Sequence, residues 1–343
     1  MVKKSKPVIG VTLGDAAGIG PELIAGTAVK GTLTAHARPL IVGGNGLLRL
    51  GMKIAGVDFE YRLVSDRELL SGETLKEGII HVLDTKSVDV DGLRLGEVSG
   101  VNGKEEGDRL VDCVSLCKRG LMDGFCFAPL NKGAMKAGGY NFTSEHELFA
   151  ENYGLKTYHS EMNLLDTVWN IRVTSHIPLR DVAKEITVEN ILKVSELGYE
   201  TLKKAGHKNP RFAIAALNPH AGDSGTCGDE EITVIADAVR LLREKNISVE
   251  GPFSADTVFI RAFRGDFDGV ITMYHDQGQI AIKLKGFEHT VTVSAGMPHP
   301  ITTPAHGTAY DIAGKGIAGL STFEDAYRLC AEMALGWMPE PDN

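Results

Sequence analysis

Three histidines stand in similar sequence contexts and together could hold a metal ion. His176, His220 and His275 each follow an apolar run of the kind that forms a buried strand, and each precedes turn residues or the start of a helix. Imidazoles delivered by three separate strand–helix units would form a site with open coordination positions, which suits zinc or another divalent ion. A single histidine in such a context is more often structural, so the hypothesis depends on all three.

Three charged residues near these histidines are candidates for acid–base chemistry. Asp276 directly follows His275 and could orient that imidazole as a ligand. Asp256 follows another strand-like run, so it is either a catalytic carboxylate or the N-cap of the next helix, and the sequence leaves both open. Lys283 comes soon after His275 and could exchange a proton beside a bound cation, or it could simply be solvated at the surface.

Two glycine-rich segments could present backbone N–H groups to a nucleotide. Residues 306–316 enclose a short predicted helical stretch between two glycine turns. Residues 14–22 follow the first predicted strand and place Pro21 near the start of a helix, which is typical of a tight strand–helix junction. This second segment lacks the G-x-G-x-x-G spacing of a dinucleotide fingerprint. It is therefore either a structural turn or a ligand-facing loop.

The elements that must position these residues alternate between short apolar runs and longer segments with helical periodicity. The predicted strands cover residues 7–13, 39–43, 78–83, 124–128, 170–174, 211–216, 249–251, 269–273 and 289–294. The predicted helices cover residues 21–29, 107–123, 179–185, 188–205, 230–245 and 323–335. This alternation predicts an α/β protein with largely parallel sheets, in which ligands bind beyond the carboxyl ends of the strands.

Length and composition limit the classes of protein that fit. A chain of 343 residues favours two lobes, and no Pro/Ser-rich linker separates them, so we expect discontinuous lobes of roughly 1–130 plus 300–343 and roughly 131–299. The net charge of -9, with scattered Lys and Arg, argues against nucleic acid as a partner. No apolar run is long enough for a membrane span or a signal peptide, so we expect a cytoplasmic protein. The five cysteines lack C-x-x-C spacing, which argues against a disulfide framework.

Seven ordered blocks of the sequence resemble the 4-hydroxythreonine-4-phosphate dehydrogenase family. They are Gly14–Glu22, Pro129–Lys132, His176–Asp181, Asn218–Gly222, Ala255–Thr257, Tyr274–Gly278 and His306–Ala309. The last block also resembles the nucleotide loop of isocitrate and isopropylmalate dehydrogenases, whose fold the family shares. The resemblance therefore implies a two-lobed α/β fold of the isocitrate/isopropylmalate dehydrogenase type.

The resemblance also implies a metal-dependent dehydrogenase. It implies a divalent ion at His176, His220 and His275, with zinc expected first and magnesium, manganese or cobalt as alternatives. It implies substrate contact by Lys283 and binding of NAD or NADP. The implied dinucleotide contacts are His306, Gly307, Thr308 and Asp311. In the family the metal ligands come from both subunits of a dimer, so an obligate homodimer with a shared active site is expected.

In the family reaction, a secondary alcohol β to a carboxylate becomes a ketone, and the resulting β-keto acid readily loses carbon dioxide. Four positions of the expected substrate shell depart from the family pattern. Glu145 and His146 stand where the family has a substrate-contacting histidine and threonine, and Thr292 and Ile301 stand where it has asparagine and arginine. Loss of a cation and gain of a carboxylate should change which anion binds.

We therefore expect a small acidic substrate, such as the 4-phosphorylated sugar acids D-threonate or D-erythronate that some relatives oxidise. The alternative within the family is a dihydrodiol of an aromatic dicarboxylate. The alternatives outside it are a zinc-dependent hydrolase or lyase that uses the same three histidines to activate water, and a non-catalytic metabolite-binding protein.

Overall fold

The computed structural model describes residues 6–71, 75–85 and 88–337. The chain forms two compact units: unit 1 comprises residues 1–157 and 297–343, and unit 2 comprises residues 158–296. The first boundary lies at residue 157 and not near residue 130 as predicted. The segment 131–157 belongs to unit 1, because its two helices pack against the long helix of that unit, Gly100–Lys118.

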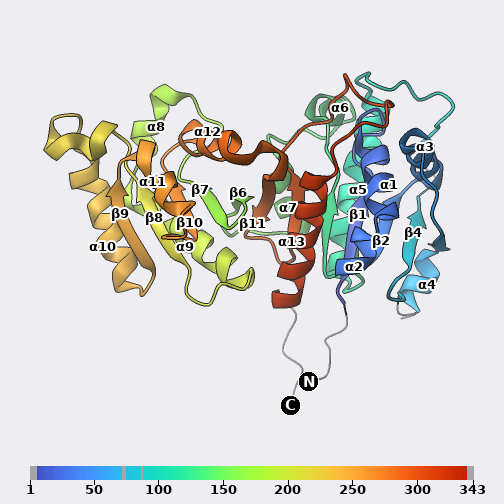
Figure 1. The fold of residues 1–343 in the computed structure, drawn as a ribbon, viewed down its shortest axis with the longest axis horizontal. Helices are drawn as coiled ribbons and strands as arrows, with labels where there is room; N and C mark the ends of the chain where they lie inside the picture. Colours follow the sequence, from blue (N-terminus) through green and yellow to red (C-terminus); the bar gives the residue numbers. More distant parts are fainter. Residues whose placement is uncertain (1–5, 72–74, 86–87, 338–343) are drawn as a thin grey trace, which may run out of the picture. The chain divides into compact units, whose positions relative to one another are not determined.

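Unit 1 contains a sheet of parallel strands in the order β3-β4-β2-β1-β5-β12. Figure 1 labels its neighbouring strands β4, β2 and β1. Its strands are β1 (Val8–Thr12), β2 (Arg38–Gly43), β3 (Tyr61–Val64), β4 (Ile80–Asp84), β5 (Gly124–Phe127) and β12 (Ile301–Pro304). Its helices are α1 (Gly20–Val29), α2 (Thr32–His36), α3 (Asn45–Ala55), α4 (Asp66–Leu70), α5 (Gly100–Lys118), α6 (Lys132–Ala137), α7 (Glu145–Tyr153) and α13 (Ser321–Trp337).

Unit 2 contains a mixed sheet in the order β11-β6-β7-β10-β8-β9, in which β6 runs antiparallel to both of its neighbours. Its strands are β6 (Ser160–Leu165), β7 (Val168–Arg172), β8 (Arg211–Ala215), β9 (Ser248–Phe253), β10 (Gly269–Thr272) and β11 (Val291–Ala295). Its α-helices are α8 (Leu179–Glu185), α9 (Val188–Lys204), α10 (Ala236–Glu244), α11 (Ala255–Ala262) and α12 (His275–Gly286). Three short helical turns complete it: η1 (Pro219–Gly225), the π-helical η2 (Glu231–Ile235) and η3 (Phe287–His289).

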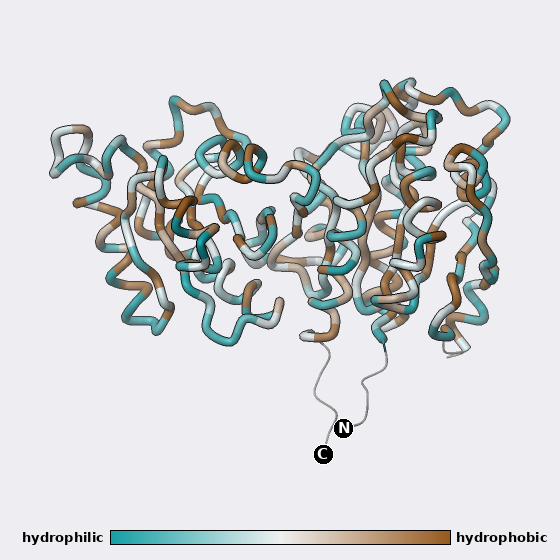
Figure 2. Tube along the Cα trace, viewed as in Figure 1, coloured by the Kyte–Doolittle hydropathy of each residue, from teal (hydrophilic) through white to brown (hydrophobic). Residues whose placement is uncertain are grey.

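The apolar core of each unit lies on its central strands. Every residue of β1 and β7 is buried, and apolar residues, brown in Figure 2, recur along these strands. Strands covered on both faces tend to have near-continuous apolar sequences, which is why β1 was recognisable in the sequence. Among the described residues, no helix combines the length and the apolar character needed to cross a membrane.

The predicted fold class, an α/β protein with largely parallel sheets, is confirmed. Some local predictions were wrong. The strands β3, β6 and β12 were not predicted, since β3 and β12 have only four residues each and β6 carries the polar residues Glu161 and Asn163. The helix predicted over 230–245 begins with the π-helical turn η2. The helical stretch expected within 306–316 is a turn, in which Ala309 and Gly314 have φ of 45° and 80°.

Candidate functional site

Two of the three predicted metal ligands lie side by side in unit 2. Strands β7 and β10 are parallel neighbours, so their carboxyl ends lie at the same edge of the sheet. His176 follows β7, and His275 is the first residue of α12, just after β10. The centroids of the two imidazole rings are 5.7 Å apart. Asp276 Oδ1 lies 2.7 Å from His275 Nδ1, which leaves Nε2 of that ring as the available metal-binding nitrogen.

The third histidine, His220, lies on a left-handed backbone turn. In η1 four residues other than glycine have positive φ, namely His220, Ala221, Asp223 and Ser224. Such a conformation costs roughly 1–2 kcal/mol per residue, so it persists only where neighbouring contacts hold it. The start of this loop is held by the buried carboxylate of Glu231.

Glu231 Oε1 accepts hydrogen bonds from the backbone N–H groups of Leu217 and Asn218, each at 2.8 Å, and Glu231 Oε2 accepts one from Asn218 Nδ2 at 3.0 Å. Burial alone would raise the pKa of Glu231, but these hydrogen bonds outweigh burial and leave the pKa below its ordinary value. Glu231 was not predicted as a functional residue, because no local sequence feature distinguishes an acidic residue that binds a preceding loop from one that is solvated.

A cavity of 580 Å³ in unit 2 is lined in part by His220, Asp256 and Asp276. Asp256 lies in the first turn of α11, and Ser254 occupies the N-cap position, so the N-cap alternative for Asp256 was wrong. Lys283 lies on the exposed side of α12, with its Nζ 5.9 Å from the centre of the Phe287 ring.

The donor set of these residues fits a divalent ion, because imidazole nitrogens are ligands that zinc and related ions prefer. Within one chain, the described residues contain no cluster of three His, Cys, Asp or Glu side chains arranged to hold a metal. The pair of His176 and His275, with Asp276 behind it, is therefore the part of the predicted ligand set that a single chain brings together.

The predicted substrate residues of unit 1 have different environments. Glu145 begins α7, and its Oε2 lies 3.6 Å from Lys132 Nζ. His146 Nε2 lies 3.2 Å from Ser144 Oγ. Ile301 is completely buried among the apolar core residues of unit 1, so a direct substrate contact by its side chain is excluded. Its assignment as a substrate-binding residue was wrong, because an isoleucine at this position packs inward with the rest of its strand.

The segment proposed to bind the dinucleotide lies in unit 1 and is fastened to the first strand–helix turn. His306, Thr308 and Asp311 are partly or fully exposed, as is Gly307. The backbone N–H of Ile19 donates to the Thr308 carbonyl at 3.1 Å, and Gly314 N donates to Glu22 Oε2 at 2.9 Å.

A Cβ added at Gly18 would lie 2.9 Å from Thr308 Cβ, so glycine is needed for this close approach. The glycine-rich turn at residues 14–22, for which two roles were left open, thus holds the 306–316 segment in place.

A buried acidic group near this turn was also missed. Glu106 lies on α5 and is 3% exposed, and its Oε1 accepts a hydrogen bond from Asn131 N at 2.9 Å. Burial, together with the nearby carboxylates of Asp15 and Glu145, holds the pKa of Glu106 well above its ordinary value. In the sequence Glu106 follows Lys104 and Glu105, so it looks like part of a solvated helix face.

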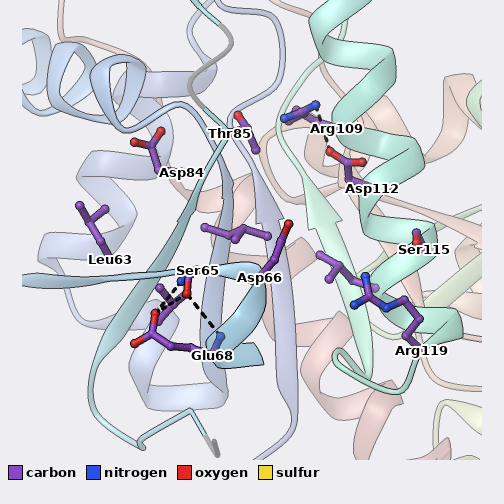
Figure 3. Close-up of a pocket in the computed structure, with 13 residues that line it drawn as sticks. Leu63, Ser65, Asp66, Glu68, Asp84, Thr85, Arg109, Asp112, Ser115 and Arg119 are labelled. Carbon is purple, nitrogen blue, oxygen red and sulfur yellow. Dashed lines mark hydrogen bonds and ion pairs between the residues drawn. The ribbon is translucent and has the colours of Figure 1, made fainter. Parts of the chain in front are cut away.

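A second cavity, of 650 Å³, lies in unit 1 between α5 and the carboxyl ends of β3 and β4. Its charged residues include Arg109 and Asp112, which form an ion pair at 3.0 Å (Figure 3). None of the residues predicted to bind substrate, metal or dinucleotide lines this cavity.

Comparison with known proteins gives matches along nearly the whole chain. The D-threonate 4-phosphate dehydrogenase of Cupriavidus necator is 39% identical over 96% of this chain and 97% of that protein. The 4-hydroxythreonine-4-phosphate dehydrogenase of Geobacter metallireducens is 35% identical over 96% of both chains.

Solved structures agree with these relatives. A 4-hydroxythreonine-4-phosphate dehydrogenase from Burkholderia phymatum is 36% identical, with a TM-score of 0.81 over 96% of this chain and 99% of that one. The fold extends to a terephthalate 1,2-cis-dihydrodiol dehydrogenase from Burkholderia xenovorans, at 22% identity and a TM-score of 0.66 over 95% of this chain and 98% of that one. Residues 35–330 match the family described as pyridoxal phosphate biosynthetic protein PdxA. The chain belongs to the PdxA family.

Proposed function

We propose that this protein oxidises the secondary alcohol of a small 4-phosphorylated 3-hydroxy acid to the 3-keto acid, with NAD or NADP as the oxidant. The observation that carries the proposal is the juxtaposition of His176 and His275, with Asp276 orienting His275, in a member of a family whose relatives are named as dehydrogenases. When bound, a divalent ion would stabilise negative charge on the substrate oxygen, and the dinucleotide would accept the hydride.

Residues of this chain are proposed to bind the metal ion, to remove the hydroxyl proton and to bind the substrate. His176, His220 and His275 are the proposed ligands of the ion, zinc before magnesium, manganese or cobalt. Asp256 is the proposed base that removes the hydroxyl proton, and the cavity that it shares with His220 supports this role. Lys283, on the exposed side of α12, is proposed to bind an anionic group of the substrate.

The substrate is proposed to be a sugar-acid phosphate such as D-threonate or D-erythronate 4-phosphate. The name of the Cupriavidus necator relative supports this class. The protein is further proposed to act as a homodimer whose metal ligands come from both subunits.

The test is the oxidation of a panel of phosphorylated four-carbon hydroxy acids with NAD and with NADP. Formation of reduced nicotinamide that depends on a divalent ion supports the proposal. If no member of the panel reduces either dinucleotide, while the metal-loaded protein releases phosphate from the same compounds, the hydrolase alternative holds instead.

Metal content tests the ligand set independently of turnover. The His176→Ala, His220→Ala and His275→Ala proteins should each contain less metal than the wild type after dialysis against a fixed free concentration of zinc. His207→Ala, which changes a histidine in the loop between α9 and β8, serves as the control and should keep the wild-type content. Wild-type metal content in all three test variants would exclude the site.

A further inference from the structure

The pairing of the parallel strands β10 and β8 ends before Met273 and Ala216 are reached. The last pair in the register is Ile271 with Ile214. On the other side of β10, Thr174 N and Thr174 Oγ1 both donate to the Met273 carbonyl, at 3.1 and 2.7 Å. Met273 and Ala216 are completely buried. Because a buried backbone group without a partner is costly, the Met273 N–H and the Ala216 carbonyl need hydrogen bonds that the strand pairing does not supply.

The side-chain amide of Gln277, in the first turn of α12, supplies both hydrogen bonds. Gln277 Oε1 accepts from Met273 N at 2.7 Å, and Gln277 Nε2 donates to the Ala216 carbonyl at 2.8 Å. A carboxamide has an acceptor and a donor side by side, as a backbone peptide group has, so it can bridge two strands where their own pairing has ended. An ionised glutamate would have no donor for the Ala216 carbonyl, so the bridge requires the amide.

The two backbone groups that Gln277 joins lead to two of the proposed metal ligands. Met273 precedes His275 by two residues, and Ala216 precedes His220 by four. Gln277 and His220 also line the same cavity of 580 Å³. One amide thus connects the segment that carries His275 to the segment that carries His220, and it sets the spacing between the starting points of these segments.

We propose that Gln277 positions His275 and His220 of its own chain and thereby acts on both metal sites of the homodimer. This inference rests on the proposed function, in which the metal ligands come from both subunits. Because the rings of His176 and His275 lie 5.7 Å apart within one chain, the third ligand of their ion is His220 of the partner subunit. The two histidines that one Gln277 positions therefore bind different ions. Gln277 is a positioning residue in this scheme, since backbone groups engage both ends of its amide.

Zinc affinity, measured by competition with a chelator, tests this role without turnover. Gln277→Met keeps the length of the side chain and removes the amide, so the zinc dissociation constant should rise about tenfold. Gln279→Met is the matched control, because Gln279 lies on the same helix and its Nε2 donates to Asn163 Oδ1 on β6, at 2.6 Å. The control should keep the zinc affinity of the wild type.

Hydrogen exchange of the metal-free protein reports on the two segments without a bound ion. The Met273 N–H loses its acceptor in Gln277→Met, so peptides that cover residues 216–220 and 273–277 should exchange faster than in the wild type. In Gln279→Met these peptides should exchange as in the wild type. Melting curves show whether each variant is folded. If Gln277→Met does not fold, Gln277→Asn takes its place, because its shorter side chain cannot reach both backbone groups.

Heterodimers with one wild-type chain, isolated by two different tags, test the action on both metal sites. A Gln277→Met chain should leave no site of wild-type zinc affinity, because its His275 and its His220 belong to different sites. A Glu231→Gln chain should leave one such site, since Glu231 binds only the segment before His220.

The outcomes separate this inference from the proposed function. Unchanged zinc affinity or unchanged exchange in the folded Gln277 variant overturns the role of Gln277, and a site of wild-type affinity in its heterodimer overturns the action on both sites. A wild type that binds no zinc overturns this role together with the metal site. If zinc binding responds as expected but neither dinucleotide is reduced, the dehydrogenase proposal fails while the role of Gln277 stands.

Discussion

The hydroxyl of Tyr310 donates a hydrogen bond to the carboxylate of Asp15, although 295 residues separate them in the chain. Asp15 is completely buried, and burial raises its pKa, an effect that the hydrogen bond from Tyr310 partly offsets. Ile19 N also donates a hydrogen bond to the Thr308 carbonyl, and Gly314 N donates one to Glu22 Oε2. These three hydrogen bonds connect the 306–316 segment to the first strand–helix turn. The segment proposed to bind the dinucleotide therefore has its conformation set by residues at the other end of the chain.

Replacing Tyr310 by phenylalanine should weaken both stability and dinucleotide binding. Asp15 Oδ2 would stay buried without its donor, while Oδ1 keeps the hydrogen bond from Ala17 N, and this loss costs about 1–3 kcal/mol of the free energy of unfolding. The Michaelis constant for NAD or NADP should rise more than that for the acid substrate. Tyr61→Phe is the control, because Tyr61 donates to Asn45 at 2.7 Å, away from residues 306–316. Equal dinucleotide constants for the wild type and Tyr310→Phe would contradict the assignment of this segment.

Glu231→Gln should lower metal affinity without unfolding the protein. A glutamine has one acceptor oxygen, and its NH₂ group would face the donating Nδ2 of Asn218, so the left-handed turn that carries His220 loses part of its anchor. We expect a zinc dissociation constant about tenfold higher, measured by competition with a chelator. Glu230→Gln is the matched control, since Glu230 contacts Asn218 Nδ2 but none of the loop's backbone N–H groups that Glu231 binds. Equal zinc affinity in Glu231→Gln and the control would rule out this positioning role.

The sequence predicted those elements correctly whose structure depends on a local sequence feature, such as helical periodicity or an N-cap residue. The predicted helix at 179–185 coincides with α8, and the predicted helix at 188–205 matches α9, whose N-cap Thr187 accepts from Asn190 N. His176 and His275 were found because each follows a buried strand, and neighbouring parallel strands bring such positions together.

The missed features depend on partners that are distant in the sequence. Arg172 was visible only as a charged residue in an apolar run, and its hydrogen bond to Asn163 joins it to a strand that was not predicted. The left-handed turn of η1 is stabilised by Glu231, and no residue type within the turn predicts this contact. Ile301 was aligned as a substrate residue because an alignment compares positions and does not show which way a side chain points.

Glu106→Gln should remove a pH dependence from the stability of the protein. The pKa of Glu106 in the folded state lies well above its ordinary value, so folding favours the protonated form. A carboxyl group whose pKa is raised on folding stabilises the folded state fully at a pH below its ordinary pKa. This stabilisation is lost as the pH rises toward the pKa of the group in the folded state. The free energy of unfolding of the wild type should therefore fall relative to the variant as the pH rises above 4.5, the ordinary pKa of this carboxyl group. Urea titrations across this range measure the difference.

The glutamine at this position keeps an oxygen that can accept from Asn131 N, so the variant should fold. A constant difference between the two proteins across the whole pH range would show that Glu106 has the same pKa in the folded and unfolded states. A wild type that gains stability over the variant as pH rises would show that the pKa is lowered, opposite to the expectation.

The positions of the three histidines predict which subunit supplies each metal ligand of the proposed dimer. The rings of His176 and His275 approach one another within a single chain. If the site is shared, these two therefore come from one subunit and the third ligand is His220 of the partner subunit. A heterodimer of His176→Ala and His220→Ala chains then has one site with both defects and one site with none. A heterodimer of His176→Ala and His275→Ala chains has one defect in each site.

Mixing under conditions that exchange subunits, with differently tagged chains to prove the exchange, distinguishes these arrangements. The mixture of His176→Ala with His220→Ala should recover about a quarter of the wild-type activity, since half of the randomly formed dimers have one intact site. The mixture of His176→Ala with His275→Ala should stay inactive. Recovery in the second mixture alone would place His275 of the partner subunit beside His176. No recovery in either mixture, despite proven exchange, would show that each active site is built from one chain.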